Sequence, residues 1–249
     1  MKKFLVVGLM LALALSLGVA VQAARPVLRV GSDVTYAPFE FADAKTGEFM
    51  GFDIELIRAI GKDMGMEVEI KNTAWDGIIP GLLNGNYDVL ISAMTITDER
   101  AQAVNFSDPY FTAGQVIVVR NDNKNVKEPK DLKGKVVAVQ INTTGDYAAQ
   151  KVEGVAKISR FNTTPEALQE VVNGAAEAAV IDLPVAKTFM KESPGKVRLA
   201  GPSFTVEYYG IAVKKSNEDL LKKVNKALAT LKANGTYDKI YEKWFGAGK

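Results

Sequence analysis

The sequence predicts an α/β fold of two similar lobes, each with a mainly parallel sheet flanked by helices, joined by two hinge crossovers. Three observations lead to this prediction. Short apolar strands alternate with amphipathic helices, the alternation begins again near Lys135, and one helix–strand unit occurs in two related copies. Alternating strands and helices are typical of parallel sheets covered by helices.

The first 23 residues stand apart from this pattern. A basic start at residues 1–3 precedes an apolar run at 4–20 and a small-residue cleavage signal at 21–23. This order is typical of a secretory signal peptide. A membrane anchor is the alternative, since the run approaches the roughly 20 residues that a span needs. Because the cleavage signal follows at once, we expect residues 1–23 to be removed and the mature protein to be exported and soluble.

Apolar spacing predicts the elements of the first lobe. Ile54, Ile57, Ile60 and Met64 recur at helical spacing, whereas short apolar runs indicate strands. The expected elements are, in order, strand 28–32, helix 53–64, strand 68–71, helix 76–83, strand 89–91 and a helix that begins after Thr97.

The second lobe repeats this order, and the chain then returns to the first. Residues 108–114 and 203–208 are interpreted as the crossovers, which places the first lobe at 24–112 and 207–249 and the second at 113–206. The expected elements are strand 115–120, strand 136–140, helix 146–152, strand 157–161, helix 165–172, strand 179–181, strand 210–213, helix 218–231 and helix 237–244.

Two segments share one plan. DGIIPGLLNGNYDVLI (76–91) and PEALQEVVNGAAEAAVI (165–181) each predict a helix ended by Asn-Gly, an acidic residue three places after the glycine, and a strand. Glycine commonly ends helices in the left-handed conformation. Chance similarity is the alternative to duplication. Ligands of parallel α/β sheets bind beyond the carboxyl ends of the strands, here residues 92–95 and Asp182, so we expect a cleft between them.

Arg100 lies in the first turn of a predicted helix. Thr97 can cap that helix. A cation in the first turn, however, interacts unfavourably with the helix dipole, at a cost of about 0.3–1 kcal/mol. A bound anion between the guanidinium and the free N–H groups would explain the position, with the Thr95 hydroxyl assisting. A surface ion pair with Asp98, Glu99 or a more distant acid is the alternative explanation.

Asp182 is the candidate for an opposite pole. It follows a predicted strand of the second lobe, where its carboxylate could hold an ammonium group or cap the next helix. If Arg100 and Asp182 face each other across the cleft, the pair fits the carboxylate and ammonium of an amino acid.

Composition excludes several functions. The chain has 31 basic and 29 acidic residues, and removal of Lys2 and Lys3 would leave 29 of each. A formally neutral protein lacks the basic surplus of a nucleic-acid partner. Without cysteine or histidine, disulfides, a lipid-bearing cysteine, the usual nucleophilic triads and a usual zinc site are unavailable to it. We expect no cofactor, no metal and no catalytic residue.

Several longer stretches carry a resemblance to a known family. They are TYAPFEF (35–41), GFDIELI (51–57), WDGIIPGL (75–82), ITDERAQAVNFSDPY (96–110), DLKGKVVAVQ (131–140) and NGTYDKIYEKWFG (234–246). With them the chain resembles the polar amino-acid-binding proteins of ABC importers, solute-binding protein family 3. Glutamine-binding members look nearest, and lysine/arginine/ornithine-binding and histidine-binding members are also similar.

The resemblance implies a two-lobed periplasmic-binding fold of type II that closes on its ligand. It implies a monomeric periplasmic receptor that captures a free L-amino acid and delivers it to the membrane permease of an ABC importer. Arg100 stands where the family binds the α-carboxylate, assisted by the Thr95 position and the backbone at Ala93. Asp182 stands where the family binds the α-ammonium.

The same comparison implies the rest of the site. Thr143 and Thr144 stand in the second-lobe loop that completes carboxylate binding, and Tyr36 and Trp75 stand at the aromatic positions that sandwich the ligand side chain. Asp33 stands at the acidic position that meets the tip of that side chain. From the residues alone, Tyr36 and Trp75 could equally be core, with Trp75 packing as a hydrophobic staple.

The sequence limits the identity of the bound amino acid less closely than it limits the site residues. An acid at position 33 favours an amide or a cation over a second carboxylate. Glutamine-binding members carry a lysine where this chain has Gln140 and a histidine where it has Ile181, and Ser92 resembles the basic-amino-acid members. Glutamine is narrowly favoured over arginine or lysine.

Two other functions remain open at this stage. The fold also resembles cyclohexadienyl dehydratases, which would need a general acid in the cleft, such as Asp33 or Asp182 with a raised pKa. A ligand-sensing module is the other possibility.

Overall fold

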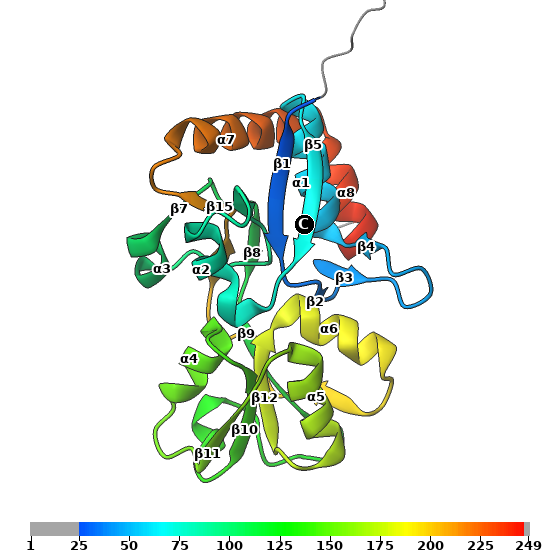
Figure 1. Cartoon of the computed structure of the whole chain (residues 1–249). Coiled ribbons are helices and arrows are strands. Elements are labelled where there is room, and N and C mark those ends of the chain that lie inside the picture. The colour runs from blue at the N-terminus through cyan, green and yellow to red at the C-terminus, as the bar shows by residue number, and fades with distance from the viewer. Residues whose placement is uncertain (1–24, 247–249) are drawn as a thin grey trace, which may run out of the picture.

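The protein consists of two lobes, each built on a five-stranded sheet and placed one above the other in Figure 1. The computed structural model describes residues 25–246, so the predicted signal peptide lies outside the described residues. Within 25–246, no helix has the length and apolar character that crossing a membrane requires.

The sheet of lobe 1 has the strand order β5-β1-β6-β15-β7. β1 (Val27–Ser32) pairs in parallel with β5 (Glu67–Asn72) and β6 (Val89–Leu90). β15 (Ala212–Lys214) pairs antiparallel with β6 and with β7 (Val104–Phe106). The predicted parallel arrangement therefore holds for three strands. β15, the strand that returns from lobe 2, runs in the opposite direction and pairs antiparallel with both of its neighbours.

Helices and a small sheet complete lobe 1. The helix expected at 76–83 begins as a 3₁₀ turn, Trp75–Gly77, and Pro80 lies in the first turn of the α-helix that follows, where a missing N–H is tolerated. The remaining elements are β2 (Thr35–Tyr36), β3 (Glu40–Ala42), β4 (Phe49–Met50), α1 (Phe52–Asp63), α2 (Ile78–Leu83), α3 (Asp98–Ala103), α7 (Glu218–Ala233) and α8 (Thr236–Phe245).

The sheet of lobe 2 has the corresponding order β11-β10-β12-β9-β13. Its central strand, β12, is parallel to β10 and antiparallel to β9. The elements are β9 (Gln115–Arg120), a 3₁₀ turn (Pro129–Leu132), β10 (Val136–Gln140), α4 (Thr144–Gln150), β11 (Lys157–Phe161), α5 (Thr164–Asn173), β12 (Ala178–Asp182), α6 (Leu183–Glu192) and β13 (Val197–Leu199).

The two related segments occupy equivalent places in the two sheets. Each glycine after the helix has a positive φ, 82° at Gly85 and 78° at Gly174. The Asp88 carboxylate accepts a hydrogen bond from the N–H of Arg29 at 3.0 Å, and the Glu177 carboxylate accepts one from the N–H of Val136 at 2.7 Å. In both lobes an acidic side chain thus binds the adjacent parallel strand, which supports the duplicated plan.

Two short strands carry the chain between the lobes. β8 (Phe111–Ala113) and β14 (Glu207–Tyr209) pair antiparallel, so the crossing segments run side by side. Phe111 packs on Phe245 of α8 at 4.9 Å between ring centroids, and its ring stacks on that of Tyr209 at 5.6 Å. This aromatic packing fixes both crossing strands to lobe 1.

Candidate functional site

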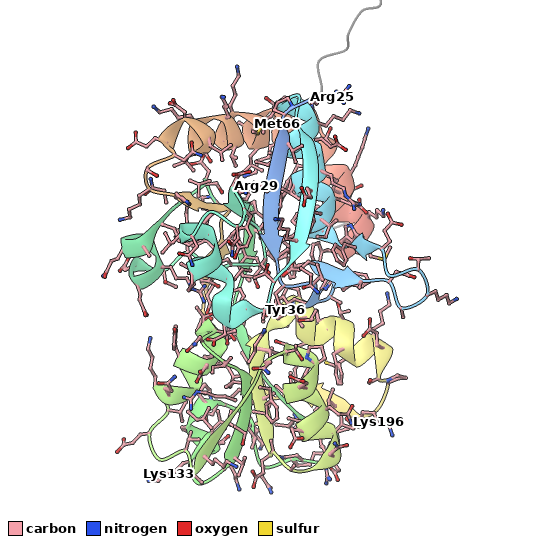
Figure 2. All side chains as sticks on the ribbon, viewed as in Figure 1. Arg25, Arg29, Tyr36, Met66, Lys133 and Lys196 are labelled. Carbon is pink, nitrogen blue, oxygen red and sulfur yellow. The ribbon has the colours of Figure 1, made fainter. Side chains whose placement is uncertain are left out.

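One pocket lies between the lobes, and all eleven predicted site residues line it. Figure 2 places Tyr36 at the level where the lobes meet, far from Met66 and Lys133 at the outer ends. About 320 Å³ of space in this pocket, counting its opening to solvent, holds no protein atoms. Its lining is Asp33, Tyr36, Glu40, Trp75, Ser92, Ala93, Thr95, Arg100, Gln140, Thr143, Thr144 and Asp182.

The strand ends bring these residues together. Asp33 follows β1, Ser92 follows β6, Gln140 ends β10 and Asp182 ends β12. β1 runs parallel to β6, and β10 runs parallel to β12, so each pair ends at one edge of its sheet. Residues from both edges line the same pocket. The pocket therefore has the position that the sequence predicted for the cleft.

Arg100 faces the pocket and is not part of a surface ion pair. Its side chain is buried, and none of the ion pairs formed within residues 25–246 includes it. Thr97 caps α3 as predicted, accepting from the N–H of Arg100. The guanidinium donates from Nη1 to the Thr95 carbonyl at 2.8 Å and lies 5.1 Å from the Trp75 ring centroid. The remaining N–H groups can bind an anion in the pocket.

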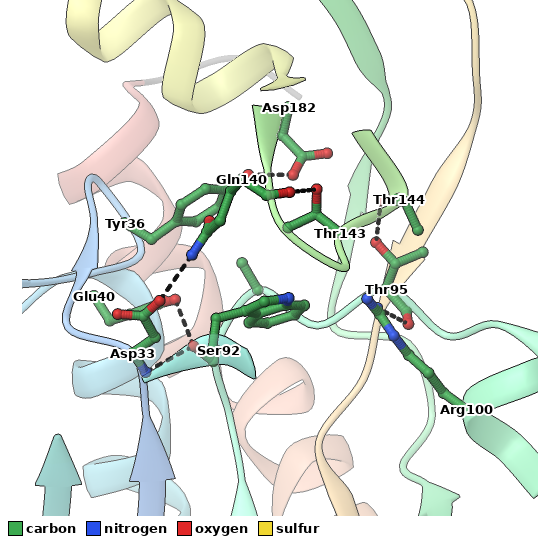
Figure 3. A pocket seen from close by; sticks show the side chains of 12 residues that line it. Asp33, Tyr36, Glu40, Ser92, Thr95, Arg100, Gln140, Thr143, Thr144 and Asp182 are labelled. Atoms are coloured by element: carbon green, nitrogen blue, oxygen red, sulfur yellow. Dashed lines mark hydrogen bonds between the residues drawn. The ribbon is translucent and has the colours of Figure 1, made fainter. Parts of the chain in front are cut away.

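Asp182 is buried at another side of the pocket (Figure 3). It occupies the N-cap position of α6, but its side chain makes no capping hydrogen bond. Instead it accepts from the Tyr36 hydroxyl and from Gln115 Nε2, the latter at 2.8 Å. Burial, followed by the negative charge of Glu207, raises the pKa of Asp182 to about 7. The ionised form of such a buried carboxyl group can be stabilised by a cationic group of a ligand.

The third side of the pocket is acidic and polar. Asp33 is 4% exposed and accepts from Gln140 Nε2 at 3.0 Å. Ser92 Oγ accepts from the N–H of Asp33 at 3.0 Å and donates to Glu40 at 2.9 Å. Burial raises the pKa of Asp33, and no ion pair among residues 25–246 neutralises it. Figure 3 shows Asp33 and Glu40 across the pocket from Arg100.

The aromatic residues differ in their packing. Both are partly buried; Tyr36 stacks on Phe39 with centroids 6.3 Å apart, whereas Trp75 donates from Nε1 to the Asn142 carbonyl at 3.2 Å. Both side chains line the pocket, and both belong to lobe 1.

Several polar groups expected at the carboxylate end already have partners. The hydroxyls of Thr95 and Thr144 donate to Glu207 Oε2 at 2.9 and 2.7 Å. Thr143 caps α4 and donates to the Gln140 carbonyl. The N–H of Ala93, a residue with φ of 44°, donates to Asp53 at 2.7 Å. The backbone of Ala93 can therefore offer only its carbonyl oxygen to a ligand.

Three residues of this network were not predicted. Glu40 lines the pocket, Gln115 binds Asp182, and Glu207 reaches in from β14. Glu40 lies in the predicted motif at 35–41 but alternates with phenylalanines, a pattern typical of an exposed strand position. No local sequence signal separates Gln115 or Glu207 from ordinary strand residues.

Glu40 forms a buried pair of acids with Asp53 of α1. Burial and the Asp53 charge raise the pKa of Glu40 well above its usual value, and burial raises that of Asp53 to about 6. Glu40 Oε2 and Asp53 Oδ1 are buried without another partner, which fits one proton shared between them. Asp53 also accepts from the Tyr110 hydroxyl at 2.7 Å.

Two α/β lobes, paired crossing strands and a charged pocket between the lobes define a periplasmic-binding-protein-like fold. The sequence profile of the bacterial extracellular solute-binding proteins, family 3, matches residues 28–247, and the chain belongs to this family.

Relatives with names and structures are similar over most of their length. A probable histidine-binding protein of Neisseria gonorrhoeae is 40% identical over 233 residues, covering 91% of this chain and 86% of the relative. An ancestral arginine-binding protein, solved bound to glutamine and bound to arginine, is 49% identical with a TM-score of 0.86, over 89% of this chain and 99% of that one.

A further solved structure bears on the enzyme alternative. It is the ancestral amino acid-binding protein AncCDT-1, described as a precursor of cyclohexadienyl dehydratase. It is 48% identical to this chain with a TM-score of 0.83, covering 88% of this chain and 95% of its own.

Proposed function

We propose that this protein is a periplasmic receptor that binds a free polar L-amino acid between its lobes and delivers it to the permease of an ABC importer. The observation that carries the proposal is one pocket between the lobes lined by a buried guanidinium, Arg100, and a buried carboxyl group, Asp182. Relatives named as amino-acid-binding proteins support it. Removal of residues 1–23 and a monomeric state belong to the same proposal.

The two charged groups suit the two ends of a zwitterion. Arg100 would hold the α-carboxylate through its free N–H groups, and Asp182 would hold the α-ammonium. Each buried charge then gains a partner, which a buried charge requires to avoid a large desolvation cost. Closure of the lobes about the two crossing strands would remove both groups from water.

Arginine is proposed as the first ligand to test, ahead of glutamine. The sequence narrowly favoured glutamine, but Asp33 is buried without a cationic partner among the described residues. A guanidinium from the ligand would supply that partner, with Tyr36 and Trp75 beside its aliphatic and planar parts. Glutamine could only donate a neutral hydrogen bond to the same carboxylate.

Titration calorimetry with L-arginine, L-glutamine, L-histidine and L-glutamate tests the proposal. We expect micromolar or tighter binding of L-arginine, which corresponds to about 8 kcal/mol, and none of L-glutamate. Arg100→Ala should weaken binding by about 2–5 kcal/mol, because the ligand carboxylate would be buried unpaired. Arg120→Ala, at an exposed ion pair outside the pocket, is the matched control. Equal affinity of Arg100→Ala and the wild type would disprove the assigned carboxylate site.

An enzyme on this fold is the second candidate. Glu40 lines the pocket, and burial with the Asp53 charge raises its pKa well above its usual value, which favours the protonated form that a general acid needs. The similarity to a precursor of cyclohexadienyl dehydratase also favours this candidate. Incubation with prephenate, followed by ultraviolet absorbance of the aromatic product, distinguishes it, and we expect no product.

The lobe boundaries also stay a proposal. We place them at residues 112/113 and 206/207, within and beside the paired strands β8 and β14.

A further inference from the structure

Asn142 contacts both lobes, although nothing in its sequence context indicates this. It lies in lobe 2 between β10 and α4, with a left-handed φ of 57°. Its backbone carbonyl accepts from Trp75 Nε1 at 3.2 Å and from Arg100 Nη2 at 3.4 Å, and both donors belong to lobe 1. Asparagine tolerates this backbone conformation better than most residues.

The side chain of Asn142 makes a second contact across the gap. Its Nδ2 donates to Asp76 Oδ1 at 2.5 Å. Both residues are exposed at the outer edge of the pocket, where Trp75 and Arg100 also line a neighbouring groove. The backbone and the side chain of one residue therefore both bind lobe 1.

Lobe 2 holds this loop in place from within. The N–H of Asn142 donates to Asp146 Oδ2 at 3.2 Å. Asp146 is 1% exposed and accepts from Arg160 Nε at 2.8 Å and from Gln150 Nε2 at 2.9 Å. Because these hydrogen bonds lie within lobe 2, they can hold the loop in the same conformation when the lobes separate.

The guanidinium of Arg100 is held by one carbonyl from each lobe. Thr95 of lobe 1 accepts from Nη1, and Asn142 of lobe 2 accepts from Nη2. Trp75, which also binds Asn142, lies against the same guanidinium. The orientation of the cation is complete only when lobe 2 is in contact.

We propose that Asn142 is a positioning residue of the closed form, which couples contact between the lobes to the orientation of Arg100 and Trp75. The inference rests on the proposed function, because it assigns those two residues to the bound ligand. Asn142 stabilises the closed form through Asp76 and acts on the ligand through Arg100, so it need not touch the ligand itself.

Asn142→Asp tests the contact by placing a second carboxylate against Asp76. We expect the Kd for L-arginine to rise at least about fivefold, because like charges meet only in the closed form. High salt should reduce the effect, since the contact is exposed. The double variant Asn142→Asp/Asp76→Asn exchanges donor and acceptor, and its Kd should return to within about twofold of the wild type. Asn125→Asp, on an exposed loop of the same lobe, is the charge-matched control.

Closure is measured separately from affinity. The chain has no cysteine, so Lys45→Cys and Lys191→Cys place one dye on each lobe for energy transfer. Asn142→Asp should lower the closed fraction both without ligand and with saturating L-arginine, while the ligand-free unfolding midpoint stays unchanged. Asp76→Ala, from the other lobe, should act in the same direction.

The two proposals fail in different ways. An unchanged closed fraction in Asn142→Asp, or no recovery in the double variant, would overturn the role of Asn142. A wild-type protein that none of the amino acids binds would instead overturn the proposed function, while the ligand-free closed fractions still decide the role of Asn142.

Discussion

At the scale of single residues, burial determines the pKa values of the acidic side chains in the pocket. Asp182 and Asp33 are both removed from water, and burial is the first cause of the raised pKa of each. An ionised ligand ammonium or guanidinium would restore their charged forms. The strength of binding should therefore depend on pH well above the range in which exposed carboxylates titrate.

Binding should weaken as the pH falls below about 7. The pKa of Asp182 is about 7 in the ligand-free protein, so below that pH the ammonium must displace a proton. We expect the Kd for L-arginine to rise roughly tenfold per pH unit between pH 6.5 and 5.5, as proton linkage requires. Calorimetry in two buffers of different ionisation enthalpy measures the released proton. Asp182→Asn should bind weakly at every pH, and a pH-independent wild type would contradict the assignment.

Replacing Glu40 with glutamine should stabilise the protein at high pH. The folded pKa of Glu40 lies above its unfolded value of 4.5, so the folded state binds the extra proton and loses stability as the pH rises from 4.5. A glutamine is neutral, can accept from Ser92 and can donate to Asp53. We expect Glu40→Gln to gain about 1 kcal/mol at pH 8 and much less at pH 4.5.

Urea unfolding of Glu40→Gln at both pH values measures this difference. Glu67→Gln, at an exposed position, is the control and should stay within about 0.5 kcal/mol of the wild type. A loss of stability at pH 8 would show that Glu40 is ionised in the folded protein.

At the scale of elements, the paired strands β8 and β14 hold the crossing segments at a fixed spacing. Gly114 directly follows β8 and faces residues that precede β14, so a Cβ there would be 2.2 Å from the Thr205 carbonyl oxygen and 2.4 Å from Ser203 Oγ. The contact is with backbone, which cannot rotate away. A glycine is therefore required by packing rather than by a positive φ.

Gly114→Ala should destabilise the protein by about 1–3 kcal/mol, the usual cost of overpacking. Gly77→Ala is the matched control, because no heavy atom lies within 4 Å of a Cβ at that position. The midpoint and slope of urea unfolding give both values. Equal stability of the two variants would mean that the crossing strands can separate without cost.

At the scale of the whole molecule, three charged residues come from different sides of one pocket. Figure 3 shows Arg100, Asp182 and Asp33 on three sides, and they derive from both lobes. Three contacts that do not lie on one line can distinguish the L and D enantiomers of an amino acid. If the proposed function holds, closure and the choice between enantiomers both require the complete two-lobed molecule.

L-Arginine at a thousandfold excess over its Kd should stabilise the protein by about 4 kcal/mol, because it binds only the folded state. D-Arginine at the same concentration should stabilise it much less, since its ammonium and side chain cannot both reach their carboxylates. Thermal unfolding measures both effects, and small-angle scattering should show a smaller radius of gyration with the L form alone. Equal shifts for the two enantiomers would rule out recognition at three points.

The alternation of strands and helices was enough to predict most of the secondary structure, because it depends on periodic burial along each segment. The duplicated pattern also predicted the strand ends that meet at the pocket, including those at Ser92 and Asp182. Arg100, Thr95 and Asp182 were candidates from their positions at strand ends and a helix start, and the other site residues came from the family resemblance. The roles of Asp88 and Glu177 became clear only when the adjacent strands were in place.

By itself, then, the sequence determined two α/β lobes, their order along the chain and the position of the cleft, since these follow from local periodicity and repeated segments. Only the tertiary structure decided which acidic side chains lie close together and which of them have raised pKa values. Tyr36 and Asp182 form a hydrogen bond although they are 146 residues apart in the sequence. Thr95 and Glu207 form one although 112 residues separate them. Such pairs leave no local pattern, because their contact and their pKa values depend on burial that exists only after both lobes have folded and met.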